Sequence, residues 1–132
     1  MKKIICKVLL LTITLIFSAG CTFSNNNDRS FWDLIKHFET NGVHVKSVNP
    51  LATIPVQAAA AFAFTIGTHQ VGVYKYDSNN EKHREKLKKV DETGVFYAVG
   101  IRYKAVRNGS YVLIDTKNHP QGEEIIRVFK SF

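Results

Sequence analysis

The side chains that could carry out chemistry are few in this chain, and their spacing is irregular. No pair of histidines has the i,i+4 spacing that places two zinc ligands on one helical face, and no acid-rich loop has the pattern of a calcium site. The carboxylate neighbours Asp91-Glu92 and Glu123-Glu124 would point about 100° apart on a helix, so neither is a ready pair for acid–base catalysis. The pattern therefore predicts no metal, no cofactor and no catalytic residue, although a catalytic triad assembled by folding needs no characteristic spacing.

One reactive side chain, that of Cys21, stands in an ordered sequence context. Lys2 and Lys3 precede an apolar run over residues 4–17, and small residues at positions 18–20 lead directly to the cysteine. As a helix, a run of about 14 residues spans roughly 21 Å, whereas a stable transmembrane helix needs about 20 apolar residues. A basic start, a short apolar run and small residues are typical of a secretory signal peptide that is removed.

The segment Ser18-Ala19-Gly20-Cys21 resembles the lipobox of small bacterial lipoproteins, which usually have Leu where Ser18 stands here. The resemblance implies that diacylglycerol is attached to the Cys21 thiol, that the chain is cleaved after Gly20, and that the new amino terminus is acylated, for example with palmitate. It also implies a lipid anchor on the extracytoplasmic side of a bacterial membrane. Secretory cleavage that leaves Cys21 as a free thiol is the alternative. The pieces 72–77 and 108–120 also resemble uncharacterised members of that group.

The chain is predicted to comprise a signal peptide over residues 1–20, a lipidated cysteine and flexible tether over 21–29, and a single domain over 30–132. The tether assignment depends on its Asn and Ser residues, which compete with regular backbone hydrogen bonding. Because Cys6 lies in the predicted signal peptide, Cys21 is the only cysteine of the remaining chain. An intramolecular disulfide and a thiolate zinc site are therefore excluded there.

The net charge of the chain is +7, with 18 Lys and Arg residues against 11 Asp and Glu. Three of the lysines lie in the predicted signal peptide, so the excess beyond it is mild. Such an excess suits an anionic membrane or wall surface, and export makes nucleic acid an improbable partner. The predicted helix 81–92 carries a basic cluster that is a candidate for contact with lipid headgroups or wall polymers: Lys82, Arg84, Lys86, Lys88 and Lys89. The alternative is a solvated helix face.

Periodicity and turn residues predict the secondary structure of the domain. The expected elements are a helix over 31–41, a short strand over 43–48, an alanine-rich helix over 55–66, a strand over 71–76, a helix over 81–92, strands over 95–106 and 110–116 joined at Asn108-Gly109, and a last helix with Glu123 in its first turn and Lys130 in its last. The order α-β-α-β-α-β-β-α predicts an α+β fold with a mostly antiparallel sheet of about four strands and helices packed on one face.

All five tyrosines lie on predicted strands, and tyrosine is favoured at protein interfaces. If they share an open sheet face, Tyr74, Tyr76, Tyr97, Tyr103 and Tyr111 form a binding surface for an envelope protein or a glycan; the alternative is that they pack beneath the helices. We therefore expect a lipid-anchored, non-enzymatic binding domain at the cell envelope. The alternative is a small envelope hydrolase, which a pocket holding His44, His69 or His119 beside a carboxylate would favour.

Overall fold

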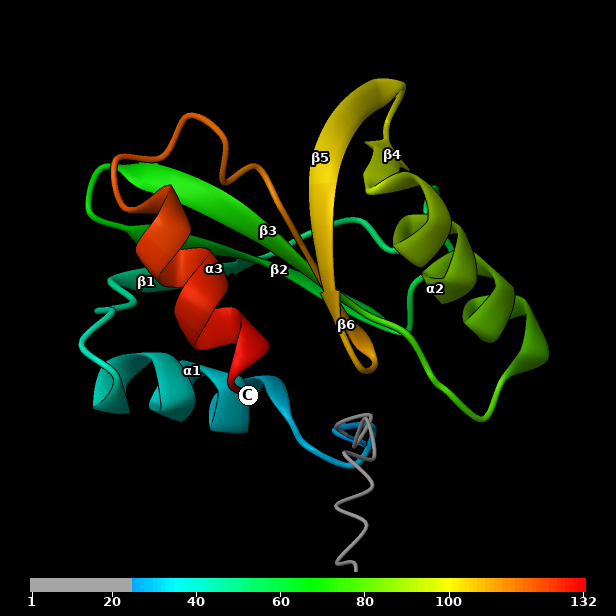
Figure 1. Ribbon diagram of the computed structural model, residues 1–132, viewed down its shortest axis with the longest axis horizontal. Coiled ribbons are helices and arrows are strands. Elements are labelled where there is room, and N and C mark those ends of the chain that lie inside the picture. Colours follow the sequence, from blue (N-terminus) through cyan, green and yellow to red (C-terminus); the bar gives the residue numbers. More distant parts are fainter. Residues whose placement is uncertain (1–24) are drawn as a thin grey trace, which may run out of the picture.

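The computed structural model describes residues 25–132, so the predicted signal peptide and Cys21 lie outside the described residues. The described chain folds as an α+β structure with one antiparallel sheet of six strands in the order β1-β2-β3-β6-β5-β4 (Figure 1). Its elements are α1 (Phe31–Thr40), β1 (Ser47–Pro50), β2 (Ala60–Ile66), β3 (His69–Lys75), α2 (Glu81–Thr93), β4 (Val95–Ala98), β5 (Ile101–Asn108), β6 (Tyr111–Ile114) and α3 (Gly122–Lys130).

The helices α1 and α2 begin and end close to where their capping residues predict. The Ser30 hydroxyl accepts a hydrogen bond from the Asp33 amide and the Asp33 carboxylate accepts one from the Ser30 amide, which together form a capping box. The Asn80 side chain caps α2 by accepting from the His83 amide, and Gly94 ends this helix at φ +65°. Both predicted helices are confirmed. Their ends could be predicted because the start and stop signals act through local hydrogen bonds.

The predicted helix over 55–66 is wrong. Residues 60–66 form the strand β2, which pairs with β1 and β3, and the preceding segment consists of turns. Within β2, Phe64 and Ile66 face one core while Ala61 faces the other and lies opposite Tyr74 in the register. The alternation of large and small residues therefore decides this segment, and pairing within the sheet overrides the high helix propensity of alanine.

The sheet also has more strands than the sequence predicts. The first short strand lies at 47–50 instead of 43–48, and the predicted strand over 95–106 is divided into β4 and β5 by a turn at Val99-Gly100. Both turn residues have positive φ, +49° and +75°, as a tight two-residue hairpin turn of this kind requires. The antiparallel hairpin is confirmed, but its turn lies at Gly109-Ser110 instead of Asn108-Gly109, because Asn108 belongs to β5 and pairs with Tyr111, and only Gly109 of the predicted pair has positive φ. The sheet thus has six strands where about four were expected.

Helices cover both faces of the sheet, so the expectation that they pack on one face is wrong. Val73 and Leu113 belong to the core beneath α1 and α3, whereas their strand neighbours Tyr74 and Val112 belong to the core beneath α2. Because alternate residues of a strand point to opposite faces, the two cores lie on opposite sides of the sheet. Figure 1 shows α2 well separated from the neighbouring helices α1 and α3.

Residues 26–29, which we call the N-terminal arm, are docked onto the domain. The Asn26 side chain is 1% exposed; its Nδ2 donates to the Asn108 carbonyl over 3.0 Å and its Oδ1 accepts from the Ser110 amide over 2.8 Å. The Arg29 guanidinium lies 3.6 Å from the centre of the Phe132 ring and donates to the Phe132 carbonyl. The interpretation of 21–29 as a flexible tether is therefore wrong for the arm.

Candidate functional site

The five tyrosines do not form one open surface. Tyr74, Tyr76 and Tyr111 are buried, Tyr103 is half-buried, and Tyr97 alone is exposed, at 64%. The Tyr76 hydroxyl donates to the Val56 carbonyl over 2.9 Å, and burial raises the pKa of Tyr76 and of Tyr111 well above the ordinary value of a tyrosine. The first three therefore belong to the cores, as the alternative interpretation expects, and only Tyr97 remains as an interface residue.

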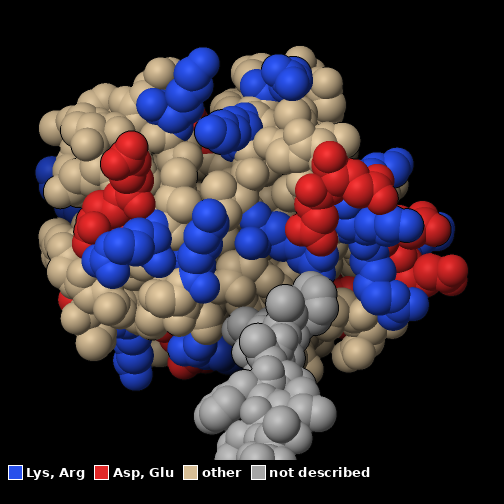
Figure 2. All heavy atoms as spheres, viewed as in Figure 1, with Lys and Arg blue, Asp and Glu red and all other residues tan. Residues whose placement is uncertain are grey.

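The basic cluster on α2 is divided by the fold. Lys82, Lys86 and Lys89 line a hollow beside the helix. Lys88 instead lies 3.8 Å from Glu92, and the Arg84 guanidinium donates to the Ser78 carbonyl over 3.1 Å. The charged face of the molecule in Figure 2 shows the same mixture, with acidic side chains among the basic ones over α2. Three of the five basic residues, Lys82, Lys86 and Lys89, therefore lie together along the hollow.

The hollow beside α2 is the clearest candidate site, and we call it the α2–β4 groove. Its volume is about 540 Å³. It is lined by residues from the 51–59 segment, the end of β3, α2 and β4, namely Pro55, Val56, Gln57, Tyr76, Lys82, Glu85, Lys86, Lys89, Val90, Val95, Phe96 and Tyr97. One wall is therefore mostly basic and the others mostly apolar, an arrangement that suits binding rather than bond-making chemistry.

Exposed apolar side chains continue this surface beyond the groove. Val99 is 77% exposed and Ile101 is 55% exposed at the turn between β4 and β5, and Ile54 lies next to the lining residue Pro55 in sequence. Val99 also has φ +49°, a conformation that branched side chains rarely adopt, and the lining residue Gln57 has φ +53°. Backbone strain and apolar exposure thus coincide beside the groove, and neither contributes to the packing of the cores.

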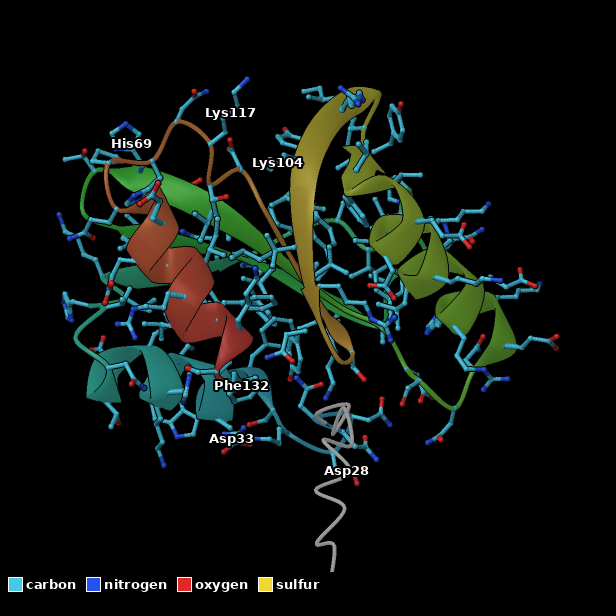
Figure 3. The ribbon with its side chains drawn as sticks, viewed as in Figure 1. Asp28, Asp33, His69, Lys104, Lys117 and Phe132 are labelled. Carbon is cyan, nitrogen blue, oxygen red and sulfur yellow. The ribbon has the colours of Figure 1, made fainter. Side chains whose placement is uncertain are left out.

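A second hollow of about 730 Å³ lies between β5, the segment 115–121 and the start of α3. Its lining includes His119 together with Glu123 and Glu124. Figure 3 places Lys104 of β5 and Lys117 at the same end of the molecule, above α3. This is the combination of a histidine and carboxylates that would favour an enzyme. The hydrogen bonds of each group show whether it is free to act as an acid or a base.

The histidine of the second hollow is fully engaged in holding the backbone. His119 Nε2 lies 2.8 Å from the Ile66 carbonyl, and its Nδ1 accepts from the Gln121 amide over 2.9 Å. Glu124 is hydrogen-bonded by Arg127, which lowers the pKa of the Glu124 carboxyl. Both ring nitrogens are thus used in hydrogen bonds to the backbone, and neither is free to act as a base in this arrangement.

The other two histidines named above do not complete a site. His44 lies 2.9 Å from Glu39 on the surface, and hydrogen bonds from His44 and the Val45 amide lower the pKa of the Glu39 carboxyl. The His69 ring lies 5.4 Å from the His119 ring at a tilt of 58°, and its Nδ1 contacts the Thr68 hydroxyl. Across residues 25–132, no three His, Cys, Asp or Glu side chains are arranged to hold a metal ion.

Within the same part of the chain, no helix is both long enough and apolar enough to cross a membrane. Comparison with protein-family models, with curated proteins and with solved structures finds no match to this chain. Function must therefore be argued from the α2–β4 groove, the docked arm and the sequence that precedes it.

Proposed function

We propose that this protein is a binding module at the bacterial cell envelope, held on the extracytoplasmic side of a membrane by lipid on Cys21. The order of basic, apolar and small residues before Cys21 supports the anchor. The α2–β4 groove supports the binding role and is the single observation that carries it. Three exposed apolar side chains beside the groove, which we call its rim, are Tyr97, Val99 and Ile101. They have no partner among the described residues, and apolar patches of this kind mark interaction sites.

The position of the groove relative to the arm supports the same proposal. Asn26 is hydrogen-bonded to Asn108 at one end of β5, and the exposed Ile101 stands at the other end. At a rise of about 3.3 Å per residue, β5 separates these two ends by roughly 23 Å. A lipid on Cys21 would be joined to the domain at the arm, so the groove rim would lie well away from the point of attachment.

An envelope hydrolase is the alternative that the sequence leaves open, and the described residues do not favour it. The histidine with carboxylates nearby, His119, uses both ring nitrogens in backbone hydrogen bonds. A binding role requires only charged groups and accessible apolar surface, and the groove has both.

The anchor is tested by replacing the cysteine. We expect Cys21→Ala to abolish labelling by a palmitate analogue in growing cells, and either to release the protein from the membrane fraction or to leave the signal peptide attached. The matched control is Cys6→Ala, which removes the other cysteine and should change neither labelling nor fractionation. If Cys21→Ala is labelled and fractionates like the unaltered chain, the lipid anchor is wrong.

The binding role is tested separately by crosslinking in intact cells with the anchor in place. A photoreactive residue at position 97, on the groove rim, should give discrete crosslinked products. The same residue at position 88, on the far side of α2, serves as the control and should give none of these products. Identical products from the two positions would contradict a binding role for the groove.

A further inference from the structure

We propose that the α2–β4 groove binds an extended polypeptide segment in which acidic and apolar residues alternate. This inference deepens the proposed function and rests on its binding role, but not on the lipid anchor. Three features of the groove define the occupant: a row of lysines on α2, an apolar wall opposite them, and an outer strand whose edge is open.

The lysine row defines the charge of the occupant. Lys82, Lys86 and Lys89 stand at i, i+4 and i+7 on α2 and all line the groove, where Glu85 is the only acidic lining residue. Along a helix rising about 1.5 Å per residue, the first two are about 6 Å apart and the outer two about 10.5 Å. Alternate residues of an extended chain are about 6.7 Å apart, so two acidic side chains at alternate positions match Lys82 and Lys86. A third, about 13 Å along the chain, is about 3 Å from the level of Lys89, a difference that the flexible lysine stem spans.

The apolar wall defines the remaining positions of the occupant. Val56, Phe96 and Tyr97 line the groove; the first two are buried, so the accessible apolar surface is that of Tyr97 together with the exposed Val99 and Ile101 at the β4–β5 turn. In an extended chain the residues between the acidic ones point to the opposite side. An apolar residue at those positions would cover this surface, whereas a uniformly acidic segment would leave it in contact with water.

The edge of β4 can bind the main chain of such a segment. Among residues 25–132, β4 is the last strand of the sheet and pairs with β5 alone. The Ala105 amide donates to the Gly94 carbonyl over 2.9 Å, which fixes which residue pairs of this ladder are hydrogen-bonded. Since bonded and non-bonded pairs alternate, Tyr97, paired with Arg102, directs its N–H and C=O away from β5. An added strand would use these groups.

Two other occupants fit the groove less well. A bilayer surface is flat and would contact the rim, but it would leave the lysines inside the hollow without partners. A second copy of this chain would bring another lysine row toward the first, and like charges oppose such contact. Both remain as outcomes of the test.

The probe is a short fluorescent peptide that alternates Glu and Val, and the protein is the full chain purified in non-ionic detergent micelles. We expect saturable binding that weakens as salt is added. Lys86→Glu should weaken it at least about fivefold, because the charge reversal replaces attraction by repulsion. Lys88→Glu is the matched control, with the same helix, residue type and charge change, and should alter the affinity less than about twofold.

The main-chain contribution is tested at position 97. Tyr97→Ala removes the ring, and Tyr97→Pro removes both the ring and the outward N–H. An edge strand tolerates proline at a position whose N–H points away from the sheet. Binding should be weaker for Tyr97→Pro than for Tyr97→Ala, while the two variants unfold at similar denaturant concentrations. Equal affinities would contradict strand addition at β4.

Several outcomes would overturn the inference. They are equal binding of a Glu-Ser peptide, equal binding of a Lys-Val peptide, and equal losses in Lys86→Glu and Lys88→Glu. Lys86-dependent clustering of phosphatidylglycerol vesicles by the reconstituted chain, without peptide binding, would assign the groove to a bilayer. Dimers of the full chain that the peptide cannot displace would assign it to a second copy. Failure of the groove would leave the Cys21 labelling result unchanged, so the two proposals fail separately.

Discussion

The substitution Asn26→Ala tests whether the arm is part of the folded domain. The Asn26 side chain is buried and makes two hydrogen bonds, one to the Asn108 carbonyl and one from the Ser110 amide. Its removal leaves both backbone groups in a buried position without their partner. Each such group costs about 1–3 kcal/mol when it is left unsatisfied. Partial access of water to the vacated space reduces the cost, so we expect the free energy of unfolding to fall by about 2–4 kcal/mol.

This loss is large against the total stability of about 5–15 kcal/mol that is usual for a domain. In equilibrium unfolding by urea, with a slope of about 1.5–2 kcal/mol per molar, the midpoint should fall by about 1–2 M. The control is Asn25→Ala, the same substitution at the exposed neighbouring residue, which should cost less than about 0.5 kcal/mol. If the two variants unfold within about 0.5 kcal/mol of each other, the arm is not docked and the flexible tether is restored.

Three further predictions concern stability. Val99→Asn should raise the free energy of unfolding by about 1 kcal/mol in urea titrations, because Val99 has φ +49° and is 77% exposed; an unchanged midpoint would contradict strain there. Gly122→Ala should lower it by about 2–3 kcal/mol, since the added Cβ would lie 2.3 Å from the Thr116 carbonyl oxygen; full stability in the same titration would count against this close approach. Burial raises the pKa of Tyr76 and Tyr111, so the unfolded state releases these protons first. Stability should therefore be full below pH of about 10 and fall above it, by up to about 1.4 kcal/mol per pH unit for each tyrosine. Tyr76→Phe should have a shallower decline, and an unchanged slope would contradict the assignment.

The parts of the fold that the sequence predicts are those decided by neighbours in the chain. Ser30 with Asp33, and Asn80 with Gly94, set the ends of α1 and α2 through hydrogen bonds and backbone angles within a few residues. The hairpin between β5 and β6 follows the same rule, with its turn one residue later than Asn108-Gly109 predicts. These signals need no knowledge of the rest of the molecule.

The parts that the sequence mispredicts depend on distant partners. β2 is a strand because it lies between β1 and β3, and its alanines accommodate large residues of the neighbouring strand, such as Tyr74 opposite Ala61. The division at Val99-Gly100 places a valine at positive φ, where turn statistics favour Asn, Asp or Gly. The alternation of large and small residues in 60–66 is itself a local sign of β2, whereas Gly100 is the one local sign of the turn at Val99, a residue that favours strands.

The candidate site also has one part that the sequence predicts and another part that depends on the fold. The i, i+4, i+7 spacing of Lys82, Lys86 and Lys89 is visible in the sequence and predicts that they share one face of α2. That they form one wall of a groove depends on Val56, which comes from a segment far away in the chain, and on the way β4 places Tyr97 beside α2. The alternation of residues on strands also explains the tyrosines, because Tyr74 and Tyr76 share the face that α2 covers.

The docked arm limits how a lipid-anchored domain could stand on a membrane. A chain spans at most about 3.5 Å per residue, so a lipid on Cys21 could lie no more than roughly 17 Å from Asn26. The rim of the groove lies about 23 Å from the Asn108 end of β5, where Asn26 is bound. An upright domain with the β4–β5 turn toward the membrane would need Asn26 farther from the lipid than this reach allows. If the arm were free as far as Arg29, the reach would be about 28 Å and that orientation would be accessible. The hydrogen bonds of Asn26 would therefore act on function as well as on stability, because they would hold the β4–β5 end of the groove away from the membrane that holds the protein, while the Tyr76 end of the groove lies beside the arm.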